Sequence, residues 1–104
     1  MATLYSNVTG STASSVFKIG AVDTFIVHWY GLTGGSFTPQ WSVDYGPATA
    51  AGTSPTWKDY TSGARSTAEG EIEGKDGGIW FRLNGSSMTG GVYAYIAGKN
   101  VLPA

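Results

Sequence analysis

The sequence offers few residues that could do chemistry at an enzyme site. Its 104 residues include one histidine, His28, and no cysteine. A zinc site needs several nitrogen or sulfur ligands, and a nucleophilic hydroxyl needs a base held beside it. No motif in the sequence supplies such partners for His28, so we expect this residue to lie on a sheet face or at an interface. The sequence therefore predicts a protein that is not an enzyme, with no catalytic residue, no cofactor and no metal site.

Three glutamates, Glu69, Glu71 and Glu73, stand at alternate positions. On a β-strand they would share one face, with about 6.8 Å between neighbours. This spacing suits a carboxylate pair or, together with Asp76, an oxygen cage for Ca²⁺. Adjacent like charges on a surface strand also prevent incorrect pairing at a sheet edge. We favour the second interpretation and predict a solvated glutamate face.

Aromatic residues make up 13% of the chain, which is more than a core of this size can hide. Trp80, Tyr93 and Tyr95 alternate with apolar residues and are therefore predicted to point outward, where a partner could contact them. The alternative is that a second sheet or a terminal arm covers these rings. Both interpretations are open from the sequence.

The segment from Ser42 to Gly46 (SVDYG), resumed by Thr56 and Trp57, resembles an Asp-box (S-x-D-x-G-x-T-W) that is split by an insertion. The motif is a structural hairpin turn that is usually repeated around a propeller. The chain length and the single copy exclude a propeller sialidase. We expect Asp44 to accept hydrogen bonds from loop amides and Trp57 to close over them. Trp41, Asp44, Gly46 and Trp57 form the predicted structural turn and core group.

Hydrophobic periodicity indicates an all-β fold, because no window shows a helical period free of glycine. Strands of period two are predicted at 16–19, 22–30, 37–45, 64–73, 79–84 and 92–96, and glycine-rich turns separate them. The strand over 22–30 has bulk on both faces and is predicted to be central. The hairpin from Phe37 to Tyr60 should organise the core. Six to seven such strands predict a single antiparallel β-sandwich or barrel.

The two ends of the chain are predicted to lie outside this domain. Residues 1–15 read as an N-terminal arm, 16–98 as the β-sandwich domain and 99–104 as a C-terminal tail. Both ends are short and poor in charge, so they could add strands or apolar side chains to a neighbour. The predicted partner-binding residues there are Leu4, Tyr5, Val101 and Leu102.

Charge excludes one class of partner. Charged residues are 12% of the chain, the net charge is −1, and the six basic residues are scattered singly. No basic stripe exists that could follow a phosphate backbone, so nucleic acid is not an expected partner. No apolar run has the length of a membrane span or a signal segment, and we expect no membrane partner and synthesis in the host cytoplasm.

The order of these segments resembles that of small β-sandwich structural proteins of tailed bacteriophages, over about residues 16–97. The pattern is F-x-x-x-W-S-x-D-Y-G, then T-W-K-D-Y, a glutamate-bearing strand, G-G-I-W-F-R-L and G-G-V-Y-A-Y-I. The inserted loop from Pro47 to Pro55 departs from that pattern. The resemblance implies a capsid decoration (cement) protein on the virion surface that stabilises the capsid. Its implied partners are the major capsid protein and copies of itself in a homotrimer.

A second function class remains open. Exposed Trp and Tyr side chains could make the protein a carbohydrate-binding or receptor-binding module of a phage tail or fibre, with a glycan as the partner.

Overall fold

The computed structural model describes residues 1–20, 24–46, 54–61, 63–75 and 77–104. In these ranges the chain forms antiparallel strands and no α-helix, which confirms the predicted all-β fold. None of the described segments is a helix that could cross a membrane. The strands are β1 (Ala2–Gly10), β2 (Phe17–Ile19), β3 (Phe25–Tyr30), β4 (Gly34–Ser42), β5 (Lys58–Asp59), β6 (Gly70–Gly74), β7 (Ile79–Gly98) and β8 (Val101–Pro103).

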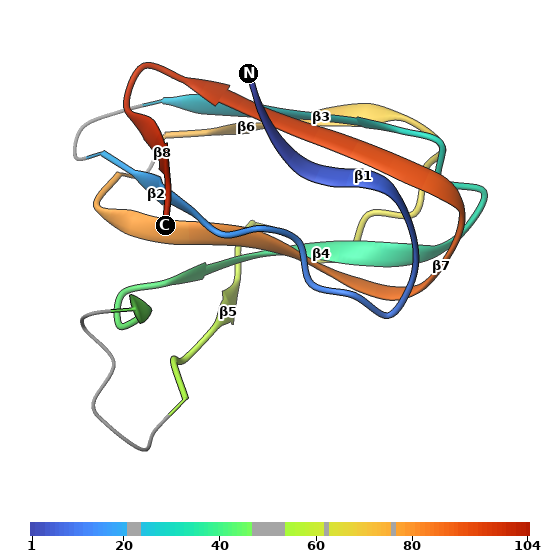
Figure 1. Ribbon diagram of the computed structural model, residues 1–104, viewed down its shortest axis with the longest axis horizontal. Coiled ribbons are helices and arrows are strands. Elements are labelled where there is room, and N and C mark those ends of the chain that lie inside the picture. Colours follow the sequence, from blue (N-terminus) through green and yellow to red (C-terminus); the bar gives the residue numbers. More distant parts are fainter. Residues whose placement is uncertain (21–23, 47–53, 62, 76) are drawn as a thin grey trace.

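The strands form two facing layers that share β7 (Figure 1). Layer A has the order β1-β7-β3-β6. Layer B has the order β8-β2-β7-β4-β5. The arrangement is that of a β-sandwich, with apolar side chains of both layers packed between them.

Strand β7 is the element around which both layers are built. Its 20 residues would span about 66 Å if they were straight, whereas the longest dimension of the molecule is 36 Å. The strand therefore turns back on itself, as Figure 1 shows, from layer B into layer A. The sequence suggested two strands with a turn over 84–91. The reversal is there, but pairing with β1 and β4 continues through it. The hairpin from Phe37 to Tyr60 contributes both of these residues to the core, as predicted, but the strand that joins the two layers is β7.

Three neighbouring segments change layer at the same end of the sandwich (Figure 1), and they approach one another closely there. We call Asn7, Gly31 and Gly91 the crossing. All three have positive φ, at 54°, 87° and 72°. A Cβ atom on Gly31 would lie 2.5 Å from the Gly91 carbonyl oxygen, and one on Gly91 would collide with the Asn7 side chain. Asparagine and glycine are the residues that adopt this backbone region most readily, so the crossing explains their positions.

The interior follows the predicted alternation along most strands. In β3 the side chains of Phe25, Val27 and Trp29 are buried, and the strand has a neighbour on each side, as its two bulky faces predicted. Residues 21–23, the start of that predicted strand, lie outside the described residues. The two halves of β7 bury their predicted inward residues: Ile79, Phe81, Leu83, Val92, Ala94 and Ile96.

The alternation predicted for residues 37–45 stops early. Strand β4 ends at Ser42, and Ser42 is buried whereas Val43 is 62% exposed. The reason is that the Ser42 hydroxyl turns inward to serve the hairpin turn described below. Trp41 remains partly buried against the core, as expected.

The N-terminal residues are part of the sandwich, which corrects the predicted arm. Strand β1 pairs with β7 in layer A, and Leu4 and Tyr5 are 4% and 1% exposed. Burial of two consecutive side chains is allowed by a register shift between Thr3 and Tyr5, where the strand bulges. The Tyr5 hydroxyl reaches across the core and donates to the Thr12 carbonyl (2.6 Å) and the Leu83 carbonyl (3.3 Å). Leu4 and Tyr5 are therefore core residues and not a surface for a partner.

The predicted C-terminal tail is also ordered in the fold. Strand β8 pairs with β2, and the Ala104 amide donates to the Val16 carbonyl (3.1 Å). Val101 packs partly buried against the core. Leu102 points the other way and is 62% exposed.

The close approach of backbones at the crossing can be tested with two glycines of equal φ. Gly31 and Gly63 both have φ of 87°, but a Cβ on Gly63 would have nothing within 4 Å. We expect Gly63→Ala to lower the free energy of unfolding by about 1–2 kcal/mol, from backbone strain alone. Gly31→Ala should lower it by about 1–3 kcal/mol more, because its Cβ must displace packed backbone. Urea unfolding measures both, and equal losses would contradict the close approach.

Tyr5 gives a second test, because burial raises its pKa from 10.0 to about 12. Its neutral form therefore stabilises the fold fully below pH 10, and this contribution is lost as pH rises from 10 towards 12. We expect Tyr5→Phe to lower the free energy of unfolding by about 1 kcal/mol at pH 7, through the lost hydrogen bond. The difference between the wild type and Tyr5→Phe should shrink between pH 9 and pH 11 in urea unfolding. A difference that stays constant over this range would contradict the buried hydroxyl.

Candidate binding surfaces

The outer face of layer B carries a continuous row of aromatic rings and cations. The Lys18 ammonium lies 3.7 Å from the centre of the Trp80 ring. Tyr45 contacts both Trp80 (centroids 6.3 Å apart) and Trp57 (5.5 Å). The Arg82 guanidinium closes the row, 4.2 Å from the centre of the Trp57 ring. We call these five side chains the aromatic row. A cation covers one face of each indole, an arrangement that is favourable electrostatically.

A hydrogen-bonded turn places Tyr45 and Trp57 on this face. Asp44 accepts hydrogen bonds from the Ser42 hydroxyl (2.8 Å) and from the Thr56 amide (2.8 Å), and the Asp44 amide donates to Ser42 Oγ (3.2 Å). The bond from Ser42, followed by that from Thr56, lowers the pKa of the Asp44 carboxyl. The predicted hydrogen bond from a loop amide to Asp44 is thus seen in the structure, while Trp57 packs against Tyr45 and Arg82. Residues 47–53 of the inserted loop lie outside the described residues.

Arg82 is fixed from two sides. Its Nε donates to Gln40 Oε1 (2.9 Å), while Trp57 packs on the guanidinium. Partial removal from water lowers the pKa of Arg82, although a guanidinium remains charged at any physiological pH. The side chain is therefore preorganised, and little of its conformational entropy would be lost if a partner bound.

The outer face of layer A carries a second group, which we call the tyrosine cluster: Tyr30, Tyr93 and Tyr95. Tyr30 on β3 lies opposite Tyr93 on β7, and the two rings are stacked with centroids 5.1 Å apart and planes 12° apart. The Tyr95 ring also stacks on that of Tyr30, with centroids 6.4 Å apart and planes 29° apart. A hydrogen bond between the Tyr30 and Tyr95 side chains raises the pKa of Tyr30. Tyr30 is the most open of the three, at 48% exposed.

His28 and the glutamates border this cluster. His28 is exposed on β3, and its Nδ1 lies 3.5 Å from Glu71 Oε2 on β6. The sheet-face position predicted for His28 is confirmed, and Glu69, Glu71 and Glu73 are all exposed as predicted. Beside them a shallow groove of about 480 Å³ lies over the paired residues of β3 and β6. Its lining residues are His28, Trp29, Tyr30, Glu69, Gly70 and Glu71.

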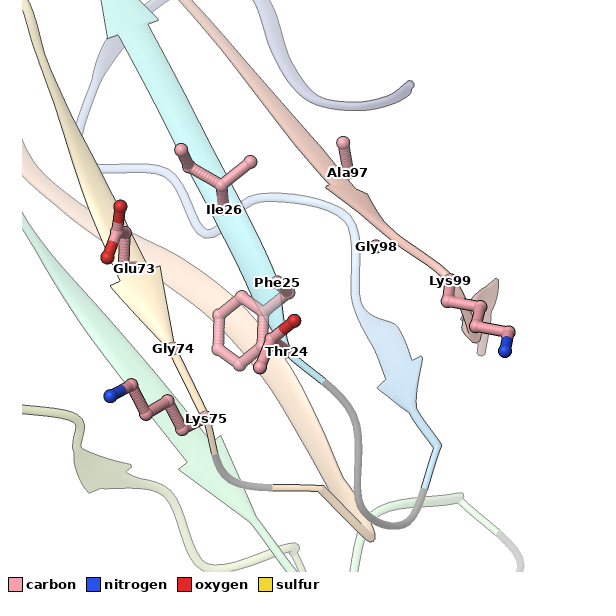
Figure 2. Close-up of a pocket in the computed structure, with 9 residues that line it drawn as sticks. All are labelled: Thr24, Phe25, Ile26, Glu73, Gly74, Lys75, Ala97, Gly98 and Lys99. Carbon is pink, nitrogen blue, oxygen red and sulfur yellow. The ribbon is translucent and has the colours of Figure 1, made fainter.

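A larger hollow of about 610 Å³ lies at the far end of layer A (Figure 2). Figure 2 shows that the side chains of Lys75 and Lys99, on opposite margins, point away from one another. The two ammonium groups therefore do not converge on one ligand. The residues that line this hollow are Thr24, Phe25, Ile26, Glu73, Gly74, Lys75, Ala97, Gly98 and Lys99.

Of the predicted outward residues, Trp80 lies in the aromatic row, and Tyr93 and Tyr95 lie in the tyrosine cluster. All three are partly buried by their neighbours. Sequence reasoning missed Lys18, Tyr30 and Arg82, whose only sequence signal is their position opposite buried residues on alternating strands. Asp76, proposed as part of a Ca²⁺ cage, lies outside the described residues. Among those described, no group of three acidic, His or Cys side chains could hold a metal ion.

No protein-family model, curated protein or solved structure matches this chain.

Proposed function

We propose that this protein is a non-enzymatic structural protein of a virus particle, which decorates the capsid by docking the outer face of layer B on the shell. The resemblance over residues 16–97 and the low charge of the surface support this assignment. A decoration protein adds buried area at the junctions between shell subunits. Expansion or rupture of the shell must then break those contacts first.

The observation that carries the proposal is the aromatic row together with its apolar margin. Leu102 on β8 pairs with Lys18 and is 62% exposed, so it extends the row at one end. Val43, equally exposed, follows β4 beside the turn that holds Tyr45. Trp, Tyr and Arg are the residues enriched at the energetic centres of protein interfaces. Because cations already cover faces of both indoles, this surface suits a protein partner better than a ligand that stacks on rings.

The attachment mode differs from the one that the sequence suggested. Strands β1 and β8 each pair with a neighbour at an edge of the sandwich, so these segments are part of the domain and do not extend from it as arms. Docking through a sheet face leaves the chain ends in place. We propose that three copies dock around a three-fold axis of the shell, because identical contacts repeated by symmetry raise the overall affinity.

The proposal is tested by measuring the copy number of this protein in purified particles of the virus that encodes it. We expect a number comparable to that of the major shell protein. Shells prepared without the protein should bind the recombinant wild type. Trp57→Ala and Leu102→Glu should each weaken this binding at least about tenfold, as for residues at the centre of an interface.

Thr3→Glu is the matched control, because it adds the same charge at an exposed position on the opposite layer. It should bind shells as the wild type does. Complete absence of the protein from particles would refute the proposal. Equal binding by Leu102→Glu and the wild type would refute layer B as the docking face.

A further inference from the structure

We propose that the groove beside the tyrosine cluster is a binding site for a neutral saccharide. This site lies on layer A and is independent of the docking face on layer B. An experiment that refutes the proposed function would therefore leave this proposal unaffected, and the reverse also holds. Three features of the groove carry the inference: an open aromatic ring, paired hydrogen-bonding groups beside it, and a local charge that selects among sugars.

The first feature is the availability of Tyr30. Tyr30 is 48% exposed and lines the groove, while Tyr93 and Tyr95 stack close to its ring and hold it in place. A pyranose has one face made of C–H groups, which packs on an aromatic ring as other apolar surfaces do. The indoles of the aromatic row are less exposed than Tyr30, and each carries a cation on one face. Tyr30 is thus more accessible to a ligand than the tryptophans of the aromatic row.

The second feature is the pair of polar groups beside the ring. His28 Nδ1 and Glu71 Oε2 lie 3.5 Å apart, and their side chains are 48% and 56% exposed. A carboxylate accepts hydrogen bonds and an imidazole can donate one, so together they can serve adjacent sugar hydroxyls, which both donate and accept. Gly70 lines the groove with its backbone only, because the place of its missing side chain lies on the inner face and is filled by the Trp29 ring. The groove, of about 480 Å³, is shallow and open, so a sugar would lie on the surface with one face in water.

The third feature is charge. Glu69 and Glu71 line the groove and Glu73 follows on the same strand, so a sulfated, phosphorylated or carboxylated sugar would be repelled. The same carboxylates would attract a cation, but a site for a quaternary ammonium surrounds the charge with converging rings. Here the rings of Tyr30 and Tyr93 are within 12° of parallel and do not form such a cage. A neutral sugar fits the geometry better.

The test uses the isolated protein and calorimetric titration with chitohexaose, cellohexaose and maltohexaose as neutral probes. A heparin hexasaccharide serves as the anionic probe and hexaarginine as the cationic one. We expect at least one neutral oligomer to bind, and the heparin fragment not to bind. Tyr30→Ala should weaken neutral binding at least about tenfold, equivalent to about 1.4 kcal/mol.

Glu71→Gln provides a second variant, since it keeps the shape of an exposed side chain and removes its charge. It should weaken the binding of the neutral oligomer several fold, whereas Leu102→Ala on layer B should leave that binding unchanged. Thermal unfolding of each variant confirms that it is folded. The proposal is overturned if no neutral oligomer binds at millimolar concentration, if Tyr30→Ala and Glu71→Gln both bind as the wild type does, or if hexaarginine is the only probe that binds.

Discussion

The structure depends on the contact between backbones at the crossing. Strands β1, β3 and β7 lie side by side in layer A, and each leads into layer B at the same end of the molecule. A Cβ on Gly31 would push against the Gly91 backbone, and one on Gly91 would collide with the Asn7 side chain, so this packing requires glycine at both positions. Once the crossing is made, β7 supplies a neighbour to four strands and fixes the spacing of the two layers. Tyr5 then joins the layers a second time, through its hydroxyl.

Two outer faces result, and they differ in what they offer a partner. On layer B the aromatic and cationic side chains satisfy one another, so the face is broad and preorganised. On layer A the tyrosines stack among themselves and leave Tyr30 open beside a groove with ionisable walls. A protein partner suits the first arrangement and a small polyol suits the second. A decoration protein docked through layer B would turn the groove on layer A away from the shell.

Much of the fold could be predicted because alternation is regular where strands are straight. The buried residues of β3 and of both halves of β7 followed from period two, as did the outward positions of Trp80, Tyr93 and Tyr95. Strand β1 could not be predicted as part of the domain. Its buried residues Leu4 and Tyr5 are consecutive, because the strand bulges there, and the alternation of apolar and polar residues is therefore lost. The glycine and serine residues of the β7 reversal likewise read as an ordinary turn.

The candidate sites were harder to predict, because they depend on which strands are neighbours. Tyr30 and Tyr93 are 63 positions apart, and only the pairing of β3 with β7 brings their rings together. The same holds for Lys18 and Trp80, which meet through the pairing of β2 with β7. Asp44 was predictable, since its partners lie within the same hairpin.

Amide hydrogen exchange of the native protein tests most directly whether β7 and the crossing make the two layers one cooperative unit. The decisive amides are those of Val27 in layer A and Phe81 in layer B, both in the core. If β7 and the crossing join the layers, both amides exchange with the same opening free energy, equal to that of global unfolding. Exchange of one layer at a clearly lower free energy, while the other stays protected, would show that the layers open separately and would contradict it.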